Sequence, residues 1–379
     1  MKNFISIITI IYFLLLGVNV NSQQGKRIPA KGFAVSEAKG KFHSYEFSRR
    51  PLEDDDILFE ILYTGICHSD VHKVRDDWKK EKYPIVPGHE IAGRVVKVGK
   101  NVTRFKVGDY AGVGVWIGSC GECEFCKSGM EHICEKKIIS FAGIDYQHND
   151  EPTNGGYSNN YLVSEKFAIK IPSDAEIEKV APLLCAGITA FNPLQYSNVK
   201  KGDKVGVAGF GGLGHMAVKF AVSKGADVTV FDITEDKRKD AIKMGAIKYV
   251  NVRNEGELEG LKNSFDLIVN SIPASHDPLL YMKMLKLYGE MAILGLPPTE
   301  ETPKIATSSF PMNQLRRVYG SDTGSIGQIQ KMVDYAVANN IYPEVEIINA
   351  EASEIDKAYQ NILDGKVKFR YVINMKTLK

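Results

Sequence analysis

The sequence predicts an α/β protein built around a doubly wound parallel sheet, accompanied by a second domain. At 379 residues the chain is long enough for about two domains with substantial cores. Beyond residue 200, short apolar strands alternate with helical segments, which is typical of a parallel sheet covered on both faces. One of these strand-to-helix junctions carries the sequence Gly-Phe-Gly-Gly-Leu-Gly at 209–214. Together, length, alternation and glycine-rich junction define the fold class.

The elements of the expected sheet follow one another along the chain in strand–helix order. Apolar runs with a period of two residues mark the strands, and longer runs that end at glycine mark the helices. An acidic residue closes the second strand, as it often does in nucleotide-binding sheets. The expected strands are 204–208, 228–231 (ended by Asp232), 265–270 and 290–294, and the expected helices are 215–223 (closed by Gly225) and 278–287.

The glycine-rich turn predicts a site for a dinucleotide cofactor. Such glycines let the backbone approach a pyrophosphate at the N-terminus of the next helix. Asp232 lies 18 residues after the last glycine and can accept hydrogen bonds from the adenosine ribose. Its carboxylate would repel a 2′-phosphate, so we expect NAD to be preferred over NADP, a preference that Lys237 would weaken. A glycine-rich loop without function is the alternative. The turn comprises Gly209, Phe210, Gly211, Gly212, Leu213 and Gly214.

Four of the six cysteines form a compact cluster that predicts a structural zinc site. Cys120, Cys123, Cys126 and Cys134 follow the spacing C-x2-C-x2-C-x7-C, which lets four thiolates converge on one tetrahedral ion. Four protein ligands leave no open position, so this ion would not be reactive. A disulfide pair is the alternative for these residues.

The other two cysteines have neighbours that suggest a second, open metal site. Cys67 begins the string Cys-His-Ser-Asp-Val-His, and His89 stands in Gly-His-Glu a little downstream. Cys185 precedes the glycine-rich turn. Two thiolates and one imidazole leave a fourth position on zinc free for a substrate oxygen. The alternative is that each cysteine is a small buried apolar residue.

The first 22 residues and the overall composition restrict location and partners. After Lys2 the run 4–20 is almost wholly apolar, and we expect residues 1–22 to be a secretory signal cut before Gln23. An uncleaved membrane anchor is the alternative. The net charge of +2 provides no broad electrostatic field for a nucleic acid. With 44% hydrophobic and 25% charged residues, the composition is that of a globular protein.

Taken together, the motifs resemble those of the zinc-dependent medium-chain alcohol dehydrogenases, particularly the cinnamyl-alcohol-dehydrogenase-like branch. The resemblance spans nearly the whole mature chain. It implies a mostly β, GroES-like catalytic domain at 28–178 with a zinc lobe at 119–135, and a final catalytic segment at 313–379. A Rossmann domain at 179–312 would be inserted between them. The motifs are Gly65–His72, Pro87–Glu90, Val107–Asp109, the four-cysteine lobe, Ala181–Gly187 and Gly209–Met216.

The resemblance also implies a role for each matching residue. Ser69 would hydrogen-bond the alcohol oxygen, His72 would complete a proton relay to water, and Asp70 would orient His89. Glu90, beside the metal, would exchange with water as a ligand or act as a structural hydrogen-bond acceptor. The metal ligands would be Cys67, His89 and Cys185; the nicotinamide and pyrophosphate contacts Thr189, His68 and Arg370; and the substrate-pocket walls Trp78 and Trp116.

The predicted function is reversible oxidation of a primary alcohol by NAD(P), with two zinc ions per chain. Aromatic pocket walls suit aromatic, allylic or medium aliphatic substrates. A polyol or sugar dehydrogenase and an exported, non-catalytic zinc- or nucleotide-binding protein are the alternatives. Secretion or a periplasmic location conflicts with the supply of cofactor, so a cytoplasmic location stays open. Membrane contact is expected only if the N-terminal segment is uncleaved, and relatives in this family suggest a homodimer or homotetramer.

Overall fold

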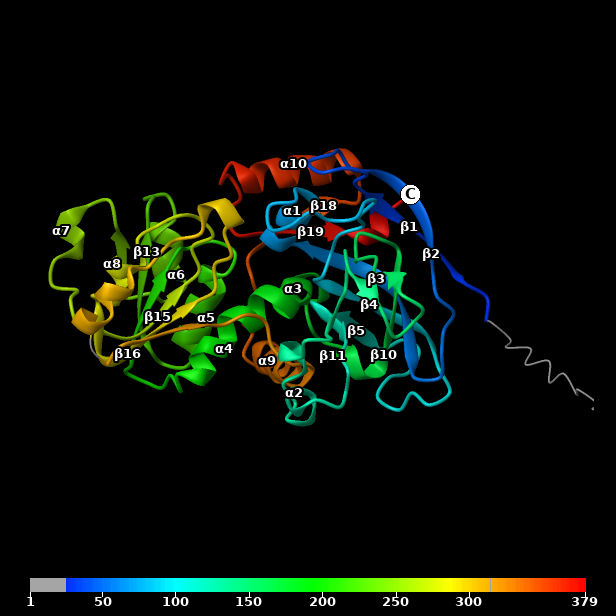
Figure 1. Cartoon of the computed structure of the whole chain (residues 1–379), viewed down its shortest axis with the longest axis horizontal. Coiled ribbons are helices and arrows are strands. Elements are labelled where there is room, and N and C mark those ends of the chain that lie inside the picture. Colours follow the sequence, from blue (N-terminus) through cyan, green and yellow to red (C-terminus); the bar gives the residue numbers. More distant parts are fainter. Residues whose placement is uncertain (1–24, 314) are drawn as a thin grey trace, which may run out of the picture.

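The chain folds into two lobes, each built around its own sheet (Figure 1). The computed structural model describes residues 25–313 and 315–379, so the signal-peptide prediction for residues 1–22 lies outside the described residues. Within the described part, no helix combines the length and hydropathy that a membrane crossing requires. The hairpin of β1 (Ile28–Ala34) and β2 (His43–Arg49) opens the described chain.

A mixed sheet of seven strands forms the centre of the first lobe. β3 is its centre: it pairs antiparallel with β4, β10 and β19. The strands β18 and β19 come from the C-terminal part of the chain, as the predicted insertion requires. The strands are β3 (Asp56–Ile66), β4 (Ile91–Val98), β5 (Tyr110–Val113), β10 (Asn160–Ser164), β11 (Ile169–Ile171), β18 (Val345–Asn349) and β19 (Arg370–Asn374).

The register of this sheet brings three distant segments to one end of β3. Thr64 lies opposite Ile91 on β4, and Ile66 lies opposite Tyr371 on β19. The residues just after β3, just before β4 and at the start of β19 therefore meet. The short helix α1 (His68–Val74) begins there, and α10 (Ala352–Leu363) covers the same sheet (Figure 1).

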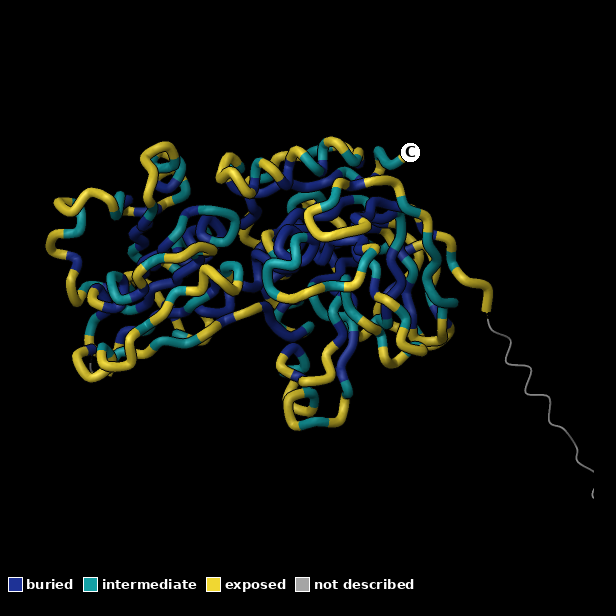
Figure 2. The backbone as a smooth tube through the Cα atoms, turned by 45° about the horizontal axis from the view of Figure 1, so that its top comes forward, coloured by how far each residue is buried: buried dark blue, intermediate teal, exposed yellow. Residues whose placement is uncertain are grey.

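The four-cysteine segment forms an exposed lobe at the edge of this domain. It contains α2 (Glu124–Lys127) and a short 3₁₀ turn at Glu131–Ile133, and it lies between β6 (Trp116–Gly118) and β7 (Ile138–Ile139). Figure 2 shows it projecting with little buried backbone. A lobe with so little core of its own depends on cross-links or a metal for its shape.

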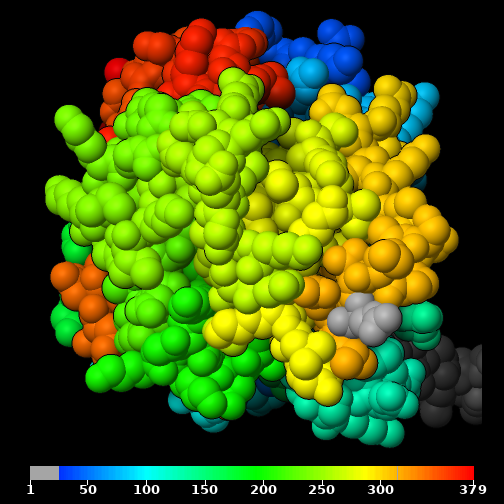
Figure 3. Space-filling view, turned by 90° about the vertical axis from the view of Figure 1, so that its left-hand side faces the viewer, coloured from blue at the N-terminus to red at the C-terminus, as the bar shows by residue number. Residues whose placement is uncertain are grey.

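The second lobe contains the predicted parallel sheet, in the order β14-β13-β12-β15-β16-β17. Val207 on the central strand faces Val230 on one side and Val269 on the other. Figure 3 views this lobe end-on. The strands are β12 (Lys204–Ala208), β13 (Asp227–Asp232), β14 (Lys248–Asn251), β15 (Phe265–Asn270), β16 (Leu285–Ile293) and β17 (Arg317–Gly320), and the helices are α5 (Gly214–Ser223), α6 (Arg238–Lys243), α7 (Glu255–Leu258) and α8 (Pro278–Met282).

Two details of this sheet differ from the expectation. The helix expected at 278–287 ends at Met282, because the chain from Leu285 onward pairs with β15 and continues as β16. The sheet also extends past the expected boundary at residue 312, since β17 pairs in parallel with β16. Both differences arise from pairing between strands, which a single segment does not reveal. The strands β14 and β17 are the edges of the sheet, and the homodimer or homotetramer stays a prediction.

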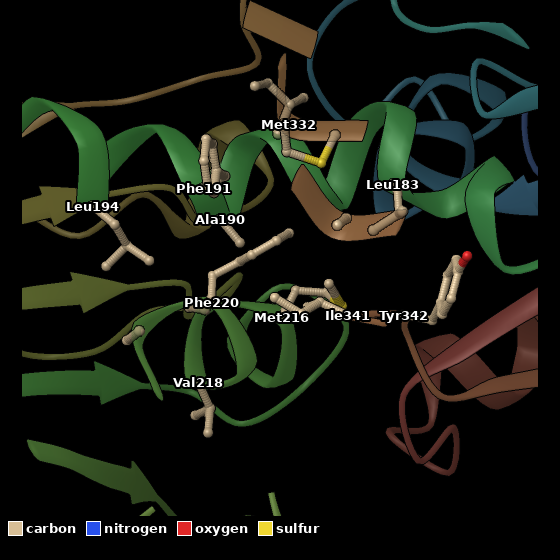
Figure 4. Packing of buried hydrophobic residues seen from close by; sticks show 14 of the residues in the cluster. Leu183, Ala190, Phe191, Leu194, Met216, Val218, Phe220, Met332, Ile341 and Tyr342 are labelled. Carbon is tan, nitrogen blue, oxygen red and sulfur yellow. The ribbon is translucent and has the colours of Figure 1, made fainter. Parts of the chain in front are cut away.

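An apolar core joins the two lobes. Phe191 on α4 (Ile188–Tyr196) packs edge-on against Phe220 of α5, with ring centroids 5.0 Å apart, and also contacts Tyr335 of α9 (Ile326–Ala338). Figure 4 shows Leu183, Ala190 and Met332 in the same cluster. The segment that carries Cys185 is thus held between the sheets by buried side chains.

Candidate active site

A buried cluster of four metal-binding side chains lies where β3, β4 and the segment before α4 meet. Ligand atoms of Cys67, His89, Glu90 and Cys185 all lie within 4.8 Å of one another, and all four residues are buried. Both cysteines are free thiols. Residues separated by more than a hundred positions in the sequence thus form one donor set of the type that zinc binds.

The local backbone explains how the cluster assembles. Gly65 lies beside Glu90, and a Cβ on that glycine would fall 1.9 Å from Glu90 Oε2, so a larger residue there would displace the carboxylate. Cys185 lies in a π-helical turn, Leu183–Gly187, between α3 (Ile177–Pro182) and α4. π-Helical turns are rare in proteins, and those that occur are often located at functional sites. Here the turn lies at the point where Cys185 joins the cluster.

Asp70 fixes the orientation of His89. His89 Nδ1 lies 2.9 Å from Asp70 Oδ1, and the backbone N–H groups of Cys67 and Gly88 donate to the same carboxylate. A carboxylate at Nδ1 places the ring proton there and leaves Nε2 as the lone-pair donor. Among the described residues, Nε2 has no hydrogen-bond partner although it is buried. A buried imidazole nitrogen left open in this way fits a metal ion.

Glu90 is also paired with a buried cation. The guanidinium of Arg370 donates to both carboxylate oxygens. Burial raises the pKa of Glu90 to about 7, although Arg370 favours the carboxylate. Hydrogen bonding from Cys185 holds the pKa of the Cys67 thiol well below its usual range. One thiol of the cluster thus has thiolate character, which metal binding requires.

Helix α1 carries the two residues expected to move the proton. Ser69 lies on its first turn, with Oγ 3.8 Å from Cys67 Sγ. His72 is buried, and its Nδ1 lies 2.8 Å from Asp77 Oδ2, while its buried Nε2 has no partner among the described residues. Asp77 was not predicted. An acidic residue five positions after His72 was the available signal, but only the turn that follows α1 brings the two side chains together.

Both tryptophans are held by hydrogen bonds to other parts of the fold. Trp78 Nε1 donates to the carbonyl of Pro297 (3.2 Å), and its ring packs at 4.9 Å from that of His72. Trp116 Nε1 donates to Thr323 Oγ1 (2.8 Å). Both side chains are partly buried, so they are anchored apolar walls. Trp78 stands directly beside the expected relay histidine.

In the exposed lobe, the four cysteines converge without disulfide bonds. Their sulfurs lie within 4.8 Å of one another, and Cys120 Sγ is 3.8 Å from Cys126 Sγ and 3.5 Å from Cys134 Sγ. Four thiolates at about 2.3 Å from one zinc ion would be about 3.8 Å apart. Backbone N–H groups of Glu122 and Cys123 lower the pKa of Cys120 to about 6. The spacing fits a tetrahedral metal, and the alternative of disulfide pairs is not what the structure contains.

The glycine-rich turn has the open backbone that a pyrophosphate needs. Gly209 has a φ of +84°, which favours glycine, and a Cβ on Gly214 would fall 1.8 Å from the carbonyl oxygen of Gly209. A Cβ on Gly211 would meet nothing within 4 Å, so the turn faces open space at that point. Gly212 and the partly buried Leu213 complete the turn before α5. This geometry fits a dinucleotide.

Asp232 closes β13 beside the turn, as predicted. Its carboxylate accepts hydrogen bonds from the backbone N–H of Phe210 (2.8 Å) and of Ile233 (2.6 Å). Lys237 lies partly buried at the start of α6. The carboxylate is therefore fixed beside the turn, and the preference for NAD stays a prediction.

The three remaining residues expected at the cofactor occupy different environments. Thr189 is buried near the start of α4, four residues after Cys185. His68 is exposed at the first position of α1. Arg370 reaches both parts of the site: it pairs with Glu90, and its Cδ would lie 3.0 Å from a Cβ on Gly212.

A parallel nucleotide-binding sheet joined to a domain with a buried two-thiol, one-imidazole cluster defines a metal-dependent dinucleotide oxidoreductase. Comparison with protein-family models agrees. Residues 53–173 match the alcohol dehydrogenase GroES-like domain, and residues 212–338 match the zinc-binding dehydrogenase domain. The chain belongs to the zinc-binding alcohol dehydrogenase family, and the predicted resemblance and fold class are confirmed.

Individual relatives match over almost their whole length. The probable formaldehyde dehydrogenase AdhA of Bacillus subtilis is 40% identical over 91% of this chain and 97% of its own. Cinnamyl alcohol dehydrogenase 2 of Rauvolfia serpentina is 40% identical over 93% of this chain and 97% of its own. Among solved structures, CAD from Helicobacter pylori complexed with NADP(H) has 46% identity and a TM-score of 0.89, covering 93% of this chain and 99% of that chain.

Proposed function

We propose that the protein catalyses reversible hydride transfer between NAD(P)(H) and a primary alcohol or its aldehyde. The observation that carries this proposal is the buried cluster of Cys67, His89, Glu90 and Cys185, with His89 Nε2 open, next to a glycine-rich turn. Relatives named as cinnamyl alcohol and formaldehyde dehydrogenases support the reaction class. The anchored rings of Trp78 and Trp116 favour aromatic, allylic or medium aliphatic substrates over polyols.

In this proposal, Cys67, His89 and Cys185 hold a zinc ion, with Glu90 beside it. Zinc would supply Lewis-acid polarisation of the alcohol oxygen. The second zinc would be held by the four lobe cysteines and would serve the structure alone. The chain therefore uses two zinc ions for two separate purposes.

The chain's own residues manage the proton. Ser69 Oγ, close to Cys67, would accept a hydrogen bond from the alcohol hydroxyl, and His72, at the far end of the relay, would take up the proton at its open Nε2 and release it to water. Asp77 holds Nδ1 of His72, so that ring nitrogen stays the donor and Nε2 stays the acceptor. Thr189 would contact the nicotinamide, and Arg370 and His68 would contact the pyrophosphate, with Arg370 also neutralising Glu90.

Steady-state kinetics with purified protein test the function. We expect NAD(P)-dependent oxidation of benzyl or cinnamyl alcohol, and reduction of the corresponding aldehydes, followed by NAD(P)H absorbance. The rates should exceed those with sorbitol, because a tryptophan wall offers few hydrogen bonds to a polyol. A faster reaction with sorbitol would favour a polyol dehydrogenase, and no turnover of any alcohol by zinc-loaded protein would favour a non-catalytic binding protein.

For the N-terminal segment, we infer cleavage before Gln23 and export. The apolar run 4–20 behind a single lysine supports this inference. N-terminal sequencing of the mature protein, combined with cell fractionation, should find Gln23 as the first residue outside the cytoplasm. Finding Met1 at the N-terminus of a protein in the soluble cytoplasmic fraction would refute the inference.

A further inference from the structure

Helix α1 ends in a buried ion pair that the reaction does not use. Lys73 Nζ lies 3.1 Å from Glu81 Oε1, and the two side chains are only 9% and 7% exposed. A buried ion pair adds little net stability, because desolvation offsets the attraction. Such a pair can instead fix the relative position of the two segments that it joins.

The pair closes the loop 75–83, which follows α1. Within this loop, Asp76 Oδ1 accepts hydrogen bonds from the backbone N–H of Glu81 (3.0 Å) and from the hydroxyl of Tyr83 (2.7 Å). The ion pair of Lys73 with Glu81 joins the far end of the loop back to α1, the helix that precedes the loop. The loop is thus fastened at its base by four side chains, those of Lys73, Asp76, Glu81 and Tyr83, and its tip contacts other parts of the molecule.

The tip of this loop carries the two residues that contact the relay histidine. Asp77 bonds His72 through its carboxylate, and the ring of Trp78 packs against the same imidazole. The tip also bonds the nucleotide-binding lobe: Trp78 donates to the carbonyl of Pro297, and the backbone N–H of Thr299 donates to the carbonyl of Asp77 (3.2 Å). The loop 75–83 therefore spans the two lobes across the proton relay.

Lys73 has a second connection, towards the metal cluster. Its Nζ lies 5.6 Å from the ring centroid of Phe141, within range of a cation–π contact. The ring of Phe141 stacks on that of His89, with centroids 5.4 Å apart and an interplanar angle of 10°. One ammonium group thus lies between the loop that orients His72 and the ring that backs the metal ligand His89.

We propose that Lys73 and Glu81 are positioning residues: their ion pair holds the loop 75–83 so that Asp77 and Trp78 stay against His72. The inference rests on the proposed function for its catalytic consequence, but not for the placement of the loop. Neither residue belongs to the set expected to bind metal, substrate or cofactor. Losing the pair should release the tip, loosen the orientation of His72 and widen the pocket beside Trp78.

The test uses the full chain with Lys73→Met, and with Lys73→Arg as the variant that keeps the charge. We expect Lys73→Met to lower kcat by roughly 10-fold or more, the usual effect of losing a group that orients a reacting residue, and to raise KM. Lys73→Arg should stay close to wild type. Lys100→Met removes an exposed pair with Asp54 (2.8 Å) and is the matched control, in which neither quantity should change.

A second readout does not depend on activity. The chain has two tryptophans, so Trp116→Phe leaves Trp78 as the sole tryptophan, whose fluorescence can be excited selectively. In that background, Lys73→Met should make Trp78 more accessible to acrylamide quenching, whereas Lys100→Met should not. If quenching changes as expected in a protein that oxidises no alcohol, the proposed function fails and the positioning of the loop stands.

A last variant separates positioning from simple stabilisation. Lys73→Met leaves Glu81 as an unpaired buried acid, which can destabilise the fold by itself. Lys73→Met/Glu81→Leu removes both charges and should restore the thermal midpoint. Positioning requires that this double variant keeps the low kcat and the high quenching. A return of both quantities to wild-type values would overturn the proposal, as would a Lys73→Met variant with unchanged quenching.

Discussion

Replacing Cys67 with serine is expected to lower kcat/KM for alcohol oxidation by about 10³-fold or more, because the loss of a Lewis acid removes several kcal/mol of transition-state stabilisation. Cys67 is one of the two thiols of the buried cluster, and it lies at the point where β3 ends beside β4 and β19. Zinc per chain, measured by atomic emission, should fall from two to one. Because serine is close in size to cysteine, the substitution at this buried position should leave the fold intact.

Cys120→Ser is the comparison that separates the two metal sites. It should also reduce zinc from two to one per chain, but its main effect should be a lower thermal midpoint, because the lobe has little core of its own (Figure 2). Turnover per folded molecule should survive at low temperature. Full activity in a sample shown to contain no zinc would contradict the proposed mechanism outright.

The nucleotide-binding half of the fold was predicted well because its signals are local. The strands β12 and β15 occur at the predicted residues, and the turn between β12 and α5 has the backbone geometry that its glycines suggested. The strands β14 and β17 were not predicted. Both are short edge strands of four residues, and they are defined by their partners β13 and β16 rather than by their own patterns.

The residues of the candidate site also divide into those with a local sequence signal and those that only the fold brings together. Spacing alone indicated the four lobe cysteines, since they lie within fifteen positions of one another, whereas Cys67, His89 and Cys185 were grouped by their flanking motifs. The contacts that tune the site were not predictable from the sequence: the pairing of Glu90 with Arg370 depends on the register of β19 against β3. The contact of Asp77 with His72 likewise depends on the turn after α1, which the sequence pattern does not predict.

The geometry at Asp232 leads to the second large prediction, a preference for NAD in the wild-type protein. Relatives include an NADP-dependent alcohol dehydrogenase from Mycolicibacterium smegmatis, at 40% identity, so the family as a whole does not decide the question for this chain. Here Asp232 is held beside the turn by the backbone N–H of Phe210 and of Ile233. A carboxylate fixed in that place cannot rotate away from a 2′-phosphate without losing both hydrogen bonds.

Asp232→Asn is the sharpest test, because asparagine removes the charge and keeps an acceptor oxygen for the N–H of Phe210, although its NH2 group replaces the oxygen that accepts from Ile233. Like charges at contact distance cost several kcal/mol, so we expect the ratio of kcat/KM for NAD to that for NADP to fall by roughly 100-fold. Lys237 should then attract the phosphate, and adding Lys237→Met should reverse part of the gain. Asp236→Asn, an exposed acid in the same segment, should leave the ratio unchanged. A wild-type protein that already prefers NADP would show that Asp232 does not face the ribose.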